Sequence, residues 1–325
     1  MIDRNSNPDY LNSFLDYSIT ILNKSPNSIK EYNYDLSNFL KYIKKDFKLT
    51  NEDNPANISI DDLSIDIVNK IKVEDIHKYL SYLAIEKNCV ASTRARKLST
   101  IRIFFKYLYT KEKLIDSNPA QDLENPKIEK RLPTYLTLDE SKKLLETVQN
   151  DDNRNATRDY AIITLFLNCG MRLSELVGIN IKNITFSEAK LSVIGKGNKE
   201  RTIYLNNACV NAINNYLDER PKEGIKFDSK DALFLSERRE RISNRTVQQI
   251  VRKELLKSGL DINKYSVHKL RHTAATLMYQ YGNVDIRALQ ELLGHESIST
   301  TEIYTHVDNS QIRSAVENNP LANLK

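Results

Sequence analysis

Residues 183–205, NITFSEAKLSVIGKGNKERTIYL, are the stretch that decides the fold. Three short runs within it, Asn183–Phe186, Lys190–Ile194 and Arg201–Leu205, carry the β-branched and aromatic residues that are typical of strands. Gly195-Lys196-Gly197-Asn198 supplies a tight turn between the last two runs. We therefore predict a small antiparallel sheet of three strands here, in the one convincing strand region of the sequence.

The sequence on both sides of this sheet predicts helices. Ahead of residue 120, apolar residues recur at helical spacing and no strand pattern is strong. Ser25-Pro26 has the pattern of a helix start, and Gly170 has that of a left-handed helix end, with Ser174 as the cap of the next helix. The predicted helices span 10–22, 26–43, 74–85, 93–110, 139–148, 158–167, 206–219, 244–258, 268–281 and 284–293. An acidic segment, 49–72, is expected to be a loop with one short helix.

Three prolines mark the boundary between two domains. Pro119, Pro126 and Pro133 fall seven residues apart in a polar stretch, where proline stops helices and stiffens the chain. We place the linker at 118–134, between a helical domain at 1–117 and a mixed domain at 135–325. The length of 325 residues fits about two domains. The fold class is therefore mainly α, with an N-terminal helical domain and an α+β C-terminal domain that holds the small antiparallel sheet.

The charge of the chain is unevenly distributed. The formal net charge is only +5 and the isoelectric point is about 8.8. Residues 87–113 nevertheless hold eight Lys or Arg against one acid, whereas residues 50–76 hold seven acids against two lysines. One part of the N-terminal half is therefore suited to bind phosphates, while another part repels them.

Cysteine usage and hydropathy indicate the compartment. Cys89, Cys169 and Cys209 are odd in number, far apart and outside any CxxC pair, so that no disulfide framework is expected and a reducing cytoplasm fits best. The N-terminus has no apolar signal-peptide core, and no run approaches 18 apolar residues. We expect a cytoplasmic protein with no membrane partner.

The last sixty residues carry the most informative chemistry. They hold four of the five histidines in an ordered series, His268-Lys-Leu-Arg271, then Leu-Gly-His295, then Tyr304. A histidine and an arginine three positions apart share one helix face. A tyrosine has few catalytic uses, and nucleophilic attack through its phenolic oxygen is one of them. Cationic donors beside a tyrosine suit a phosphate under attack, which makes nucleic acid strand chemistry the leading hypothesis.

Each of these residues taken alone has a simpler explanation. Arg172 follows the expected glycine cap and could be an ordinary surface arginine, and Lys196 an ordinary turn lysine. The turn is not a phosphate-binding P-loop, because it lacks the GxxxxGK[ST] spacing. A metal site is not favoured, because HKLRH differs from HExxH and no carboxylate or cysteine lies at matching spacing. His295 could be structural, and so could Tyr304, one of seventeen tyrosines.

The combination of these residues is specific. The order Arg172, Lys196, His268-x-x-Arg271, His295 and Tyr304 resembles the tyrosine recombinase, or phage integrase, family. The segments around them support this likeness. Asn168–Leu176 resembles the TGLRxSEL segment of the family, Ile194–Arg201 its catalytic hairpin, and Leu292–Val307 the block that carries its nucleophile. The likeness covers nearly all of 131–310. The compact size and Arg131-Leu-Pro-Thr-Tyr-Leu-Thr resemble the Xer branch of the family.

The resemblance implies a set of catalytic roles. Tyr304 would be the nucleophile, Arg172, Arg271 and His295 would hold the phosphate, Lys196 would be the general acid, and His268 would assist proton removal from Tyr304. Glu175 would orient His268 or an arginine from behind. The family fold is a helical core-binding domain followed by a DNA breaking-rejoining catalytic domain. No cofactor and no metal are implied, because the covalent link conserves the energy of the bond.

The resemblance also implies partners. These are double-stranded DNA with a pseudo-palindromic recombination site and a homo- or heterotetramer on paired sites, with a partner recombinase or a DNA translocase as further candidates. The basic face of the helix at 93–110 is the candidate DNA contact, through Arg94, Arg96, Lys97 and Arg102, although a solvated helix face would look the same. The tail at 310–325 would pack on a neighbouring protomer. The acidic segment is expected to face away from DNA.

Three functions compete at this point. The preferred one is a site-specific recombinase that resolves chromosome dimers through a Holliday junction, in chromosome partition at cell division. The alternatives are an integrase or excisionase of a mobile element and, in a different class, a type IB topoisomerase-like enzyme that relaxes DNA. A DNA-binding module with a decayed site is disfavoured, because all six catalytic positions hold chemically competent residues.

Overall fold

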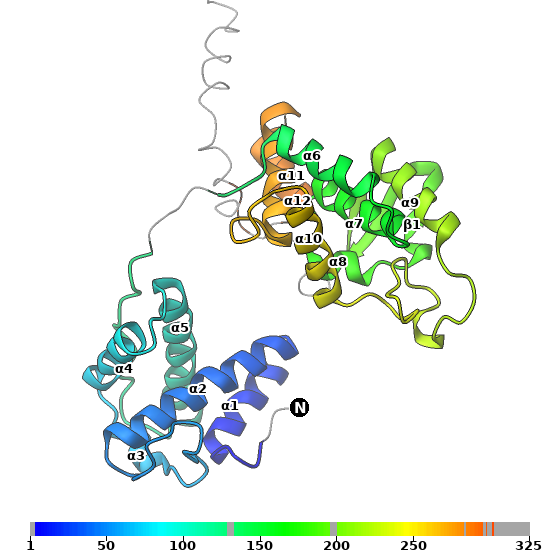
Figure 1. Ribbon diagram of the computed structural model, residues 1–325. Coiled ribbons are helices and arrows are strands. Elements are labelled where there is room, and N and C mark those ends of the chain that lie inside the picture. Colours follow the sequence, from blue (N-terminus) through cyan, green and yellow to red (C-terminus); the bar gives the residue numbers. More distant parts are fainter. Residues whose placement is uncertain are drawn as a thin grey trace, which may run out of the picture. The chain divides into compact units, whose positions relative to one another are not determined.

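The computed structural model describes residues 4–128, 133–195, 200–282 and 284–294, together with 297 and 301. The chain divides into two compact units, Met1–Lys130 and Arg131–Lys325. Within the described residues, the structure is mainly helical with one three-stranded antiparallel sheet, which confirms the predicted fold class (Figure 1). No helix in this part of the chain has the length and apolar character needed to cross a membrane.

The described residues of the N-terminal unit form helices and loops, with no strand. Its α-helices are α1 (Asp9–Thr20), α2 (Pro26–Asp46), α3 (Ile65–Asn69), α4 (Val73–Ile85) and α5 (Ala91–Tyr107), and α5 continues into the π-helical turn η1 (Leu108–Glu112). The start of α2 is as predicted, because the Ser25 hydroxyl accepts a hydrogen bond from the Ser28 N–H at 3.3 Å and Pro26 is the first helical residue. The core of this unit includes Ala120 and Leu123, so the stretch predicted as a linker begins within the unit.

The acidic segment folds back onto α2. Lys44 donates to the carboxylate of Asp62 and to the carbonyl oxygen of Ser59, and Lys45 pairs with Asp53 at 3.3 Å. Ile60 and other apolar residues of the segment are buried in the core of the unit. The carboxylates therefore neutralise lysines of their own unit, and the short helix predicted in this segment is α3.

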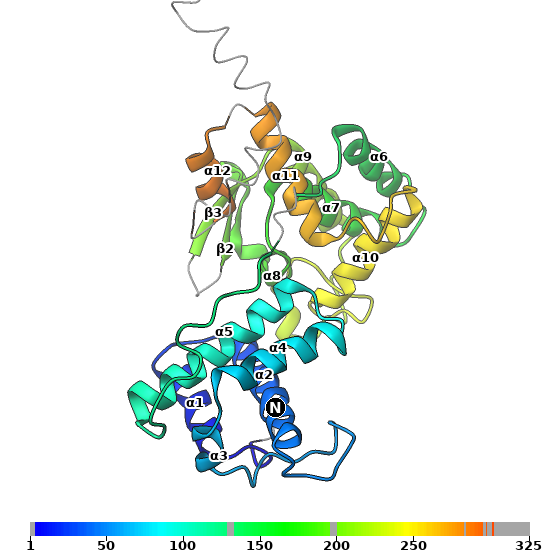
Figure 2. The same ribbon diagram turned by 90° about the vertical axis from the view of Figure 1, so that its left-hand side faces the viewer.

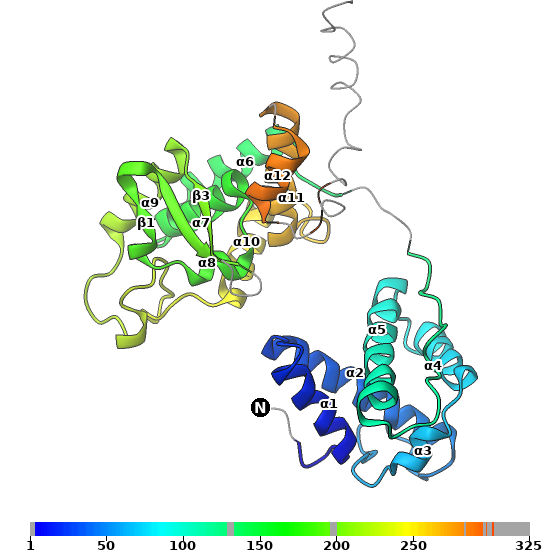
Figure 3. The ribbon, with the colours of Figure 1, turned by 180° about the vertical axis from the view of Figure 1, so that it is seen from behind.

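The C-terminal unit surrounds the small sheet with helices. Its sheet has the order β1 (Ile184–Thr185), β2 (Lys190–Ile194) and β3 (Glu200–Tyr204), with Leu191 opposite Ile203 and Val193 opposite Arg201. Its helices are α6 (Leu138–Gln149), α7 (Ala156–Cys169), α8 (Leu173–Gly178), α9 (Asn207–Glu219), α10 (Asn244–Lys257), α11 (Val267–Tyr281) and α12 (Ile286–Leu293). The largely buried α7 packs against α6, α9 and α11 and forms the centre of the core (Figure 3).

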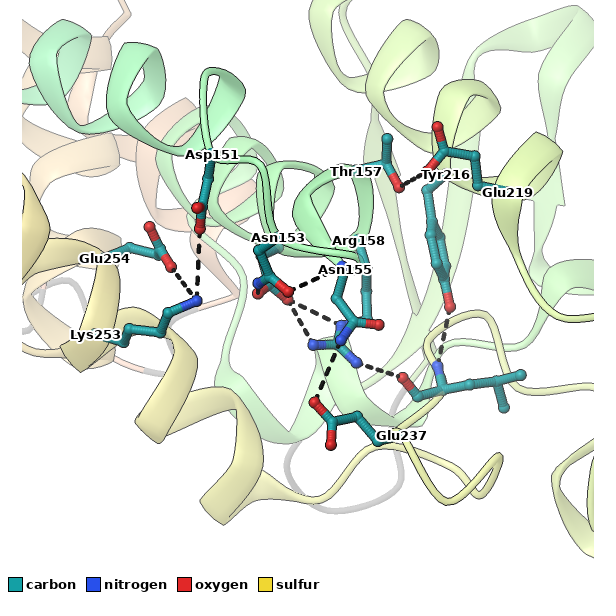
Figure 4. Close-up of polar contacts among 12 residues, drawn as sticks. Asp151, Asn153, Asn155, Thr157, Arg158, Tyr216, Glu219, Glu237, Lys253 and Glu254 are labelled. Atoms are coloured by element: carbon teal, nitrogen blue, oxygen red, sulfur yellow. Dashed lines mark hydrogen bonds and ion pairs between the residues drawn. The ribbon is translucent and has the colours of Figure 1, made fainter.

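A polar network fixes the loop that leads into α10. Arg158 of α7 is buried beside Asp159 and donates to the carbonyl oxygen of Leu235 at 3.0 Å, while the Leu235 N–H donates to the hydroxyl of Tyr216 at 3.1 Å (Figure 4). Ser243 then caps α10 by accepting from the Thr246 N–H. These contacts hold α10 in place against the core, and α10 forms one wall of the cleft described next.

Candidate active site

A cleft of about 720 Å³ lies between α8, α10 and α11. Its lining includes Arg172, His268 and Arg271, which come from two segments almost one hundred residues apart in the sequence. Asn244 and Gln248 of α10 line it as well. The fold therefore brings three of the six predicted catalytic residues to one concave site.

Arg172 is placed by a sharp turn between two helices. Gly170 ends α7 with φ +58°, a conformation that costs little only for glycine, and Arg172 then caps the start of α8. The prediction that Ser174 caps this helix is wrong, because the helix begins at Leu173 and Ser174 already lies inside it. A Cβ on Gly170 would come within 2.9 Å of the Leu293 side chain, so this turn is also tightly packed.

Glu175 holds Arg172 from two sides. Its carboxylate accepts from the backbone N–H of Arg172 at 2.7 Å and from the Arg172 guanidinium at 2.9 Å, and its side chain is fully buried. Arg201 of β3 donates to the same carboxylate at 2.9 Å. Burial by itself would raise the pKa of Glu175, but the hydrogen bonds from Arg201 and Arg172 lower it overall. The side chain is therefore an ionised anchor for two arginines.

Arg271 is almost completely buried in α11, with an exposed fraction of 4%. Its guanidinium donates to the carbonyl oxygen of Gly170 at 2.5 Å and to that of Leu293 at 2.7 Å. These bonds connect the end of α7 with the end of α12 and fix the orientation of the guanidinium at the cleft. A planar group held in this way is preorganised to receive a phosphate oxygen.

His268 lies one turn before Arg271 on the same face of α11 and is exposed to solvent in the cleft. Its ring packs edge to face against that of His272, with 4.6 Å between the ring centroids. Desolvation by the surrounding atoms, and then the positive charges of Arg271 and Lys269, lower the pKa of His268 below its ordinary value of 6.5. The neutral imidazole, which can accept a proton, is thus favoured at neutral pH.

The other predicted catalytic residues, Lys196, His295 and Tyr304, lie outside the described residues, as does the tail 310–325. The described chain reaches the residues just before two of them, Gly195 after β2 and Gly294 after α12. Among the residues that the structure describes, no group of three or more His, Cys, Asp or Glu side chains could hold a metal ion.

The four predicted DNA contacts of α5 do not share one open face. The prediction that Lys97 lies on the solvated face is wrong, because it is buried and donates to Asp35 of α2 at 2.8 Å. Arg96 is exposed but also pairs with Asp35, at 2.9 Å, and Arg102 donates to Asn125 at 2.9 Å. Arg94 is half-buried and donates to the carbonyl oxygen of Cys89. The face available to a phosphate is therefore narrower than the sequence predicts.

Arg201 contacts the site but is not among the residues predicted from the sequence. The signal was present in the strand pattern. Arg201 lies two residues before the buried Ile203 and therefore on the core-facing side of β3, where an arginine needs a partner. That partner is Glu175.

Most of the chain is similar to one family of known proteins. Residues 134–311 match the Phage integrase family, and residues 11–114 match the phage integrase N-terminal SAM-like domain. The Tyrosine recombinase XerC of Caldanaerobacter subterraneus subsp. tengcongensis is 55% identical over 316 residues, which cover 97% of this chain and 88% of that protein. The XerC of Thermodesulfovibrio yellowstonii is 36% identical over 305 residues, or 92% of each chain.

Solved structures agree on the fold. The XerH site-specific recombinase bound to palindromic difH substrate, in a post-cleavage complex, matches with a TM-score of 0.72 at 24% identity, over 95% of this chain and 83% of that one. This chain therefore belongs to the phage integrase family and, within it, to the Xer branch of the tyrosine recombinases.

Proposed function

We propose that this site-specific DNA recombinase resolves chromosome dimers by cutting and rejoining DNA through a 3′-phosphotyrosyl intermediate and a Holliday junction. The observation that carries the proposal is the cleft where Arg172, His268 and Arg271 meet. The support for the Xer-like role is the 55% identity to a XerC over 97% of the chain. This similarity favours a Xer-like recombinase over a mobile-element integrase and over a type IB topoisomerase-like enzyme.

The phosphate is the group that this cleft is proposed to bind. Two guanidinium forks, Arg172 and Arg271, donate to the non-bridging oxygens, and His295 adds a third donor. These donors stabilise the charge that builds up on five-coordinate phosphorus, and one such donor is typically worth about 2.7–4 kcal/mol of barrier. Tyr304 attacks the phosphorus in line with the 5′ oxygen and leaves a 3′-phosphotyrosyl ester and a free 5′-hydroxyl.

Two proton transfers accompany this step. Lys196 protonates the departing 5′ oxygen, which is a poor leaving group as an alkoxide, and such an acid contributes about 10²–10⁴-fold. His268 accepts a proton from Tyr304, because an unperturbed tyrosine has a pKa of about 10 and is neutral at physiological pH. The lowered pKa of His268 supports this role, because the ring is then uncharged at neutral pH. The ester conserves the energy of the broken bond, so religation needs no ATP.

DNA binding is shared between the two units in this proposal. The helical unit is the core-binding domain, joined to the catalytic domain through the part of 118–134 that follows Leu123, and the two hold a duplex that carries a pseudo-palindromic site. Arg94, Arg96 and Arg102 are the candidate phosphate contacts of α5. Lys97 shares the Asp35 carboxylate with Arg96 and so supports that arginine alone.

The assembly is a homo- or heterotetramer on paired sites in the cytoplasm. The tail 310–325 is proposed to pack on a neighbouring protomer, with a second recombinase or a DNA translocase as further partners. Deletion of 310–325 should impair synapsis and strand exchange while each protomer still binds its half-site. Unchanged recombination by the truncated protein would contradict this part of the proposal.

The central test uses a nicked suicide duplex built on the sequence that the protein itself selects from a randomised DNA pool. The wild-type protein should form an adduct that survives SDS, and peptide mapping should place the DNA on Tyr304. Tyr304→Phe should bind the duplex normally and form no adduct, and Tyr279→Phe is a matched tyrosine control. An adduct with Tyr304→Phe, or cleavage of any duplex without regard to sequence, would overturn the proposal.

A further inference from the structure

Three consecutive carbonyl oxygens at the end of α12 are each bound by a different arginine. Arg201 of β3 donates to Leu292, Arg271 of α11 to Leu293 at 2.7 Å, and Arg172 to Gly294 at 2.5 Å. The last carbonyls of a helix lack partners within the helix and carry the negative end of its dipole, so cations suit them. Two of the three arginines are proposed phosphate donors, and Arg201 has no role so far.

Arg201 connects this helix end to the anchor of Arg172. Its guanidinium donates to both carboxylate oxygens of Glu175, at 2.9 and 3.3 Å, while its third nitrogen reaches the Leu292 carbonyl. Only 14% of its side chain is exposed. Glu175 in turn binds the Arg172 guanidinium at 2.9 Å. One side chain therefore bridges β3, the start of α8 and the end of α12, which lie close together in Figure 2.

Packing at Gly294 shows how closely Arg201 approaches. A Cβ at this position would lie 3.0 Å from the Cδ of Arg201 and 3.5 Å from an Arg172 nitrogen. The backbone there has φ +64°, so Gly294 both ends α12 and leaves room for the two arginines. The next residue in the sequence is His295.

We infer that Arg201 is a positioning residue for strand cleavage, which sets the Arg172 guanidinium and the carboxyl end of α12 in the geometry that the phosphate requires. It does so without touching DNA. The inference rests on the proposed function. A lysine could not replace Arg201, because a single ammonium cannot span both Glu175 oxygens and the Leu292 carbonyl as a planar fork does.

The test compares Arg201→Lys and Arg201→Met with Arg220→Lys. Arg220 is a buried arginine of the same unit that likewise donates to several carbonyls, those of Leu233, Lys230 and Ala232, but contacts neither Glu175 nor α12.

Three quantities are measured for each variant. They are single-turnover adduct formation on the self-selected suicide duplex, affinity for that duplex, and the thermal unfolding midpoint of the protein. Both Arg201 variants should bind DNA as the wild type does and cleave about 100-fold more slowly, a loss that a displacement of about 1 Å in a catalytic site can cause. Arg220→Lys should lose thermal stability and keep the wild-type rate below its midpoint.

A second substrate separates positioning of the phosphate donors from loss of the general acid. A duplex with sulfur in place of the bridging 5′ oxygen has a leaving group that departs without a proton. This substrate should restore cleavage by Lys196→Ala, which lacks only the general acid. Cleavage by Arg201→Lys should stay slow, because its phosphate donors are still misplaced. Gly294→Ala is a second perturbation, because its methyl group would lie 3.0 Å from the Cδ of Arg201 and push that side chain away. It should give the same pattern even if an Arg201 variant does not fold.

The outcomes are distinct. Three results would overturn the positioning role and leave the proposed function intact. They are a wild-type cleavage rate for Arg201→Lys, restoration of Arg201→Lys cleavage by the sulfur substrate, and a rate defect in Arg220→Lys as large as that in Arg201→Lys. If the Arg201 variants do not fold, wild-type cleavage by Gly294→Ala overturns it. If the wild-type protein forms no adduct, the proposed function fails first, and this inference fails with it.

Discussion

At the scale of single residues, Glu175 has the largest expected effect on the folded state of the site. Its folded pKa lies below the ordinary value of 4.5, so its ion pairs stabilise the fold above that pH and are lost as the pH falls through the lowered value. Glu175→Gln leaves Arg172 and Arg201 without their shared anion and should cost about 3–5 kcal/mol at pH 7. Urea unfolding between pH 3 and pH 7 measures this. The variant should lose the Glu175 part of the acid dependence, and an unchanged pH profile would contradict the assignment.

His268 makes a separate prediction about the pH dependence of the rate. Its lowered pKa means that the ring becomes charged, and stops accepting a proton, only below pH 6.5. Single-turnover cleavage should therefore be flat around neutrality and fall with an inflection below pH 6.5. His268→Gln should be slower and lack this inflection, while His272→Gln should retain it. An inflection above pH 6.5 in the wild type would argue against His268 as the proton acceptor.

At the scale of elements, the buried carboxylate of Asp35 joins α2 to α5. It accepts from Arg96, from Lys97 at 2.8 Å and from Thr100 at 3.1 Å, and its side chain is fully buried. Asp35→Ala leaves the Lys97 ammonium buried without its anion, which typically costs about 3–5 kcal/mol. Chemical denaturation should show this loss. Asp35→Ala combined with Lys97→Met should recover much of the stability, and a double variant as unstable as the single one would contradict this explanation.

The elements also show what sequence patterns can and cannot predict. Lys190–Ile194 was predicted with its observed bounds, and the Ser25-Pro26 start and the Gly170 end were predicted because caps are local chemistry. The prediction that Ser174 caps α8 failed because the helix begins earlier, at Leu173. The Glu175 carboxylate accepts from the backbone N–H of Arg172, which is the capping residue. The prediction that Lys97 is exposed failed because Lys97 lies on the apolar stripe of α5, four residues before Ile101. A lysine is acceptable there only because the Asp35 carboxylate, 62 residues earlier in the sequence, pairs with it.

The same limit applies to the candidate site. Arg172, His268 and Arg271 could be predicted from the sequence, because their combination and order along the chain resemble those of a known family, although none of the three is specific alone. The shared carbonyl end of α12, which Arg201, Arg271 and Arg172 all bind, could not be predicted. Backbone acceptors have no residue identity, so only tertiary structure reveals them.

At the scale of the whole molecule, the two units have separate hydrophobic cores, one from α1–α5 and one around α7. The chain contains no tryptophan, so a single introduced indole reports on one core alone. Tyr82→Trp places it at the edge of the N-terminal core and Tyr160→Trp at the edge of the C-terminal core, both at partly buried positions.

These two reporters test whether the units unfold independently. Asp35→Ala should lower the urea midpoint seen by the indole at position 82 and leave that at position 160 unchanged, because the hydrogen-bond partners described for Asp35 all belong to its own unit. Glu175→Gln should lower the urea midpoint seen by the indole at position 160 and leave that at position 82 unchanged. Each reporter variant without the second substitution is the control for the indole itself. If both substitutions moved both midpoints equally, the chain would unfold as one cooperative body, and a change in one unit would not be confined to it.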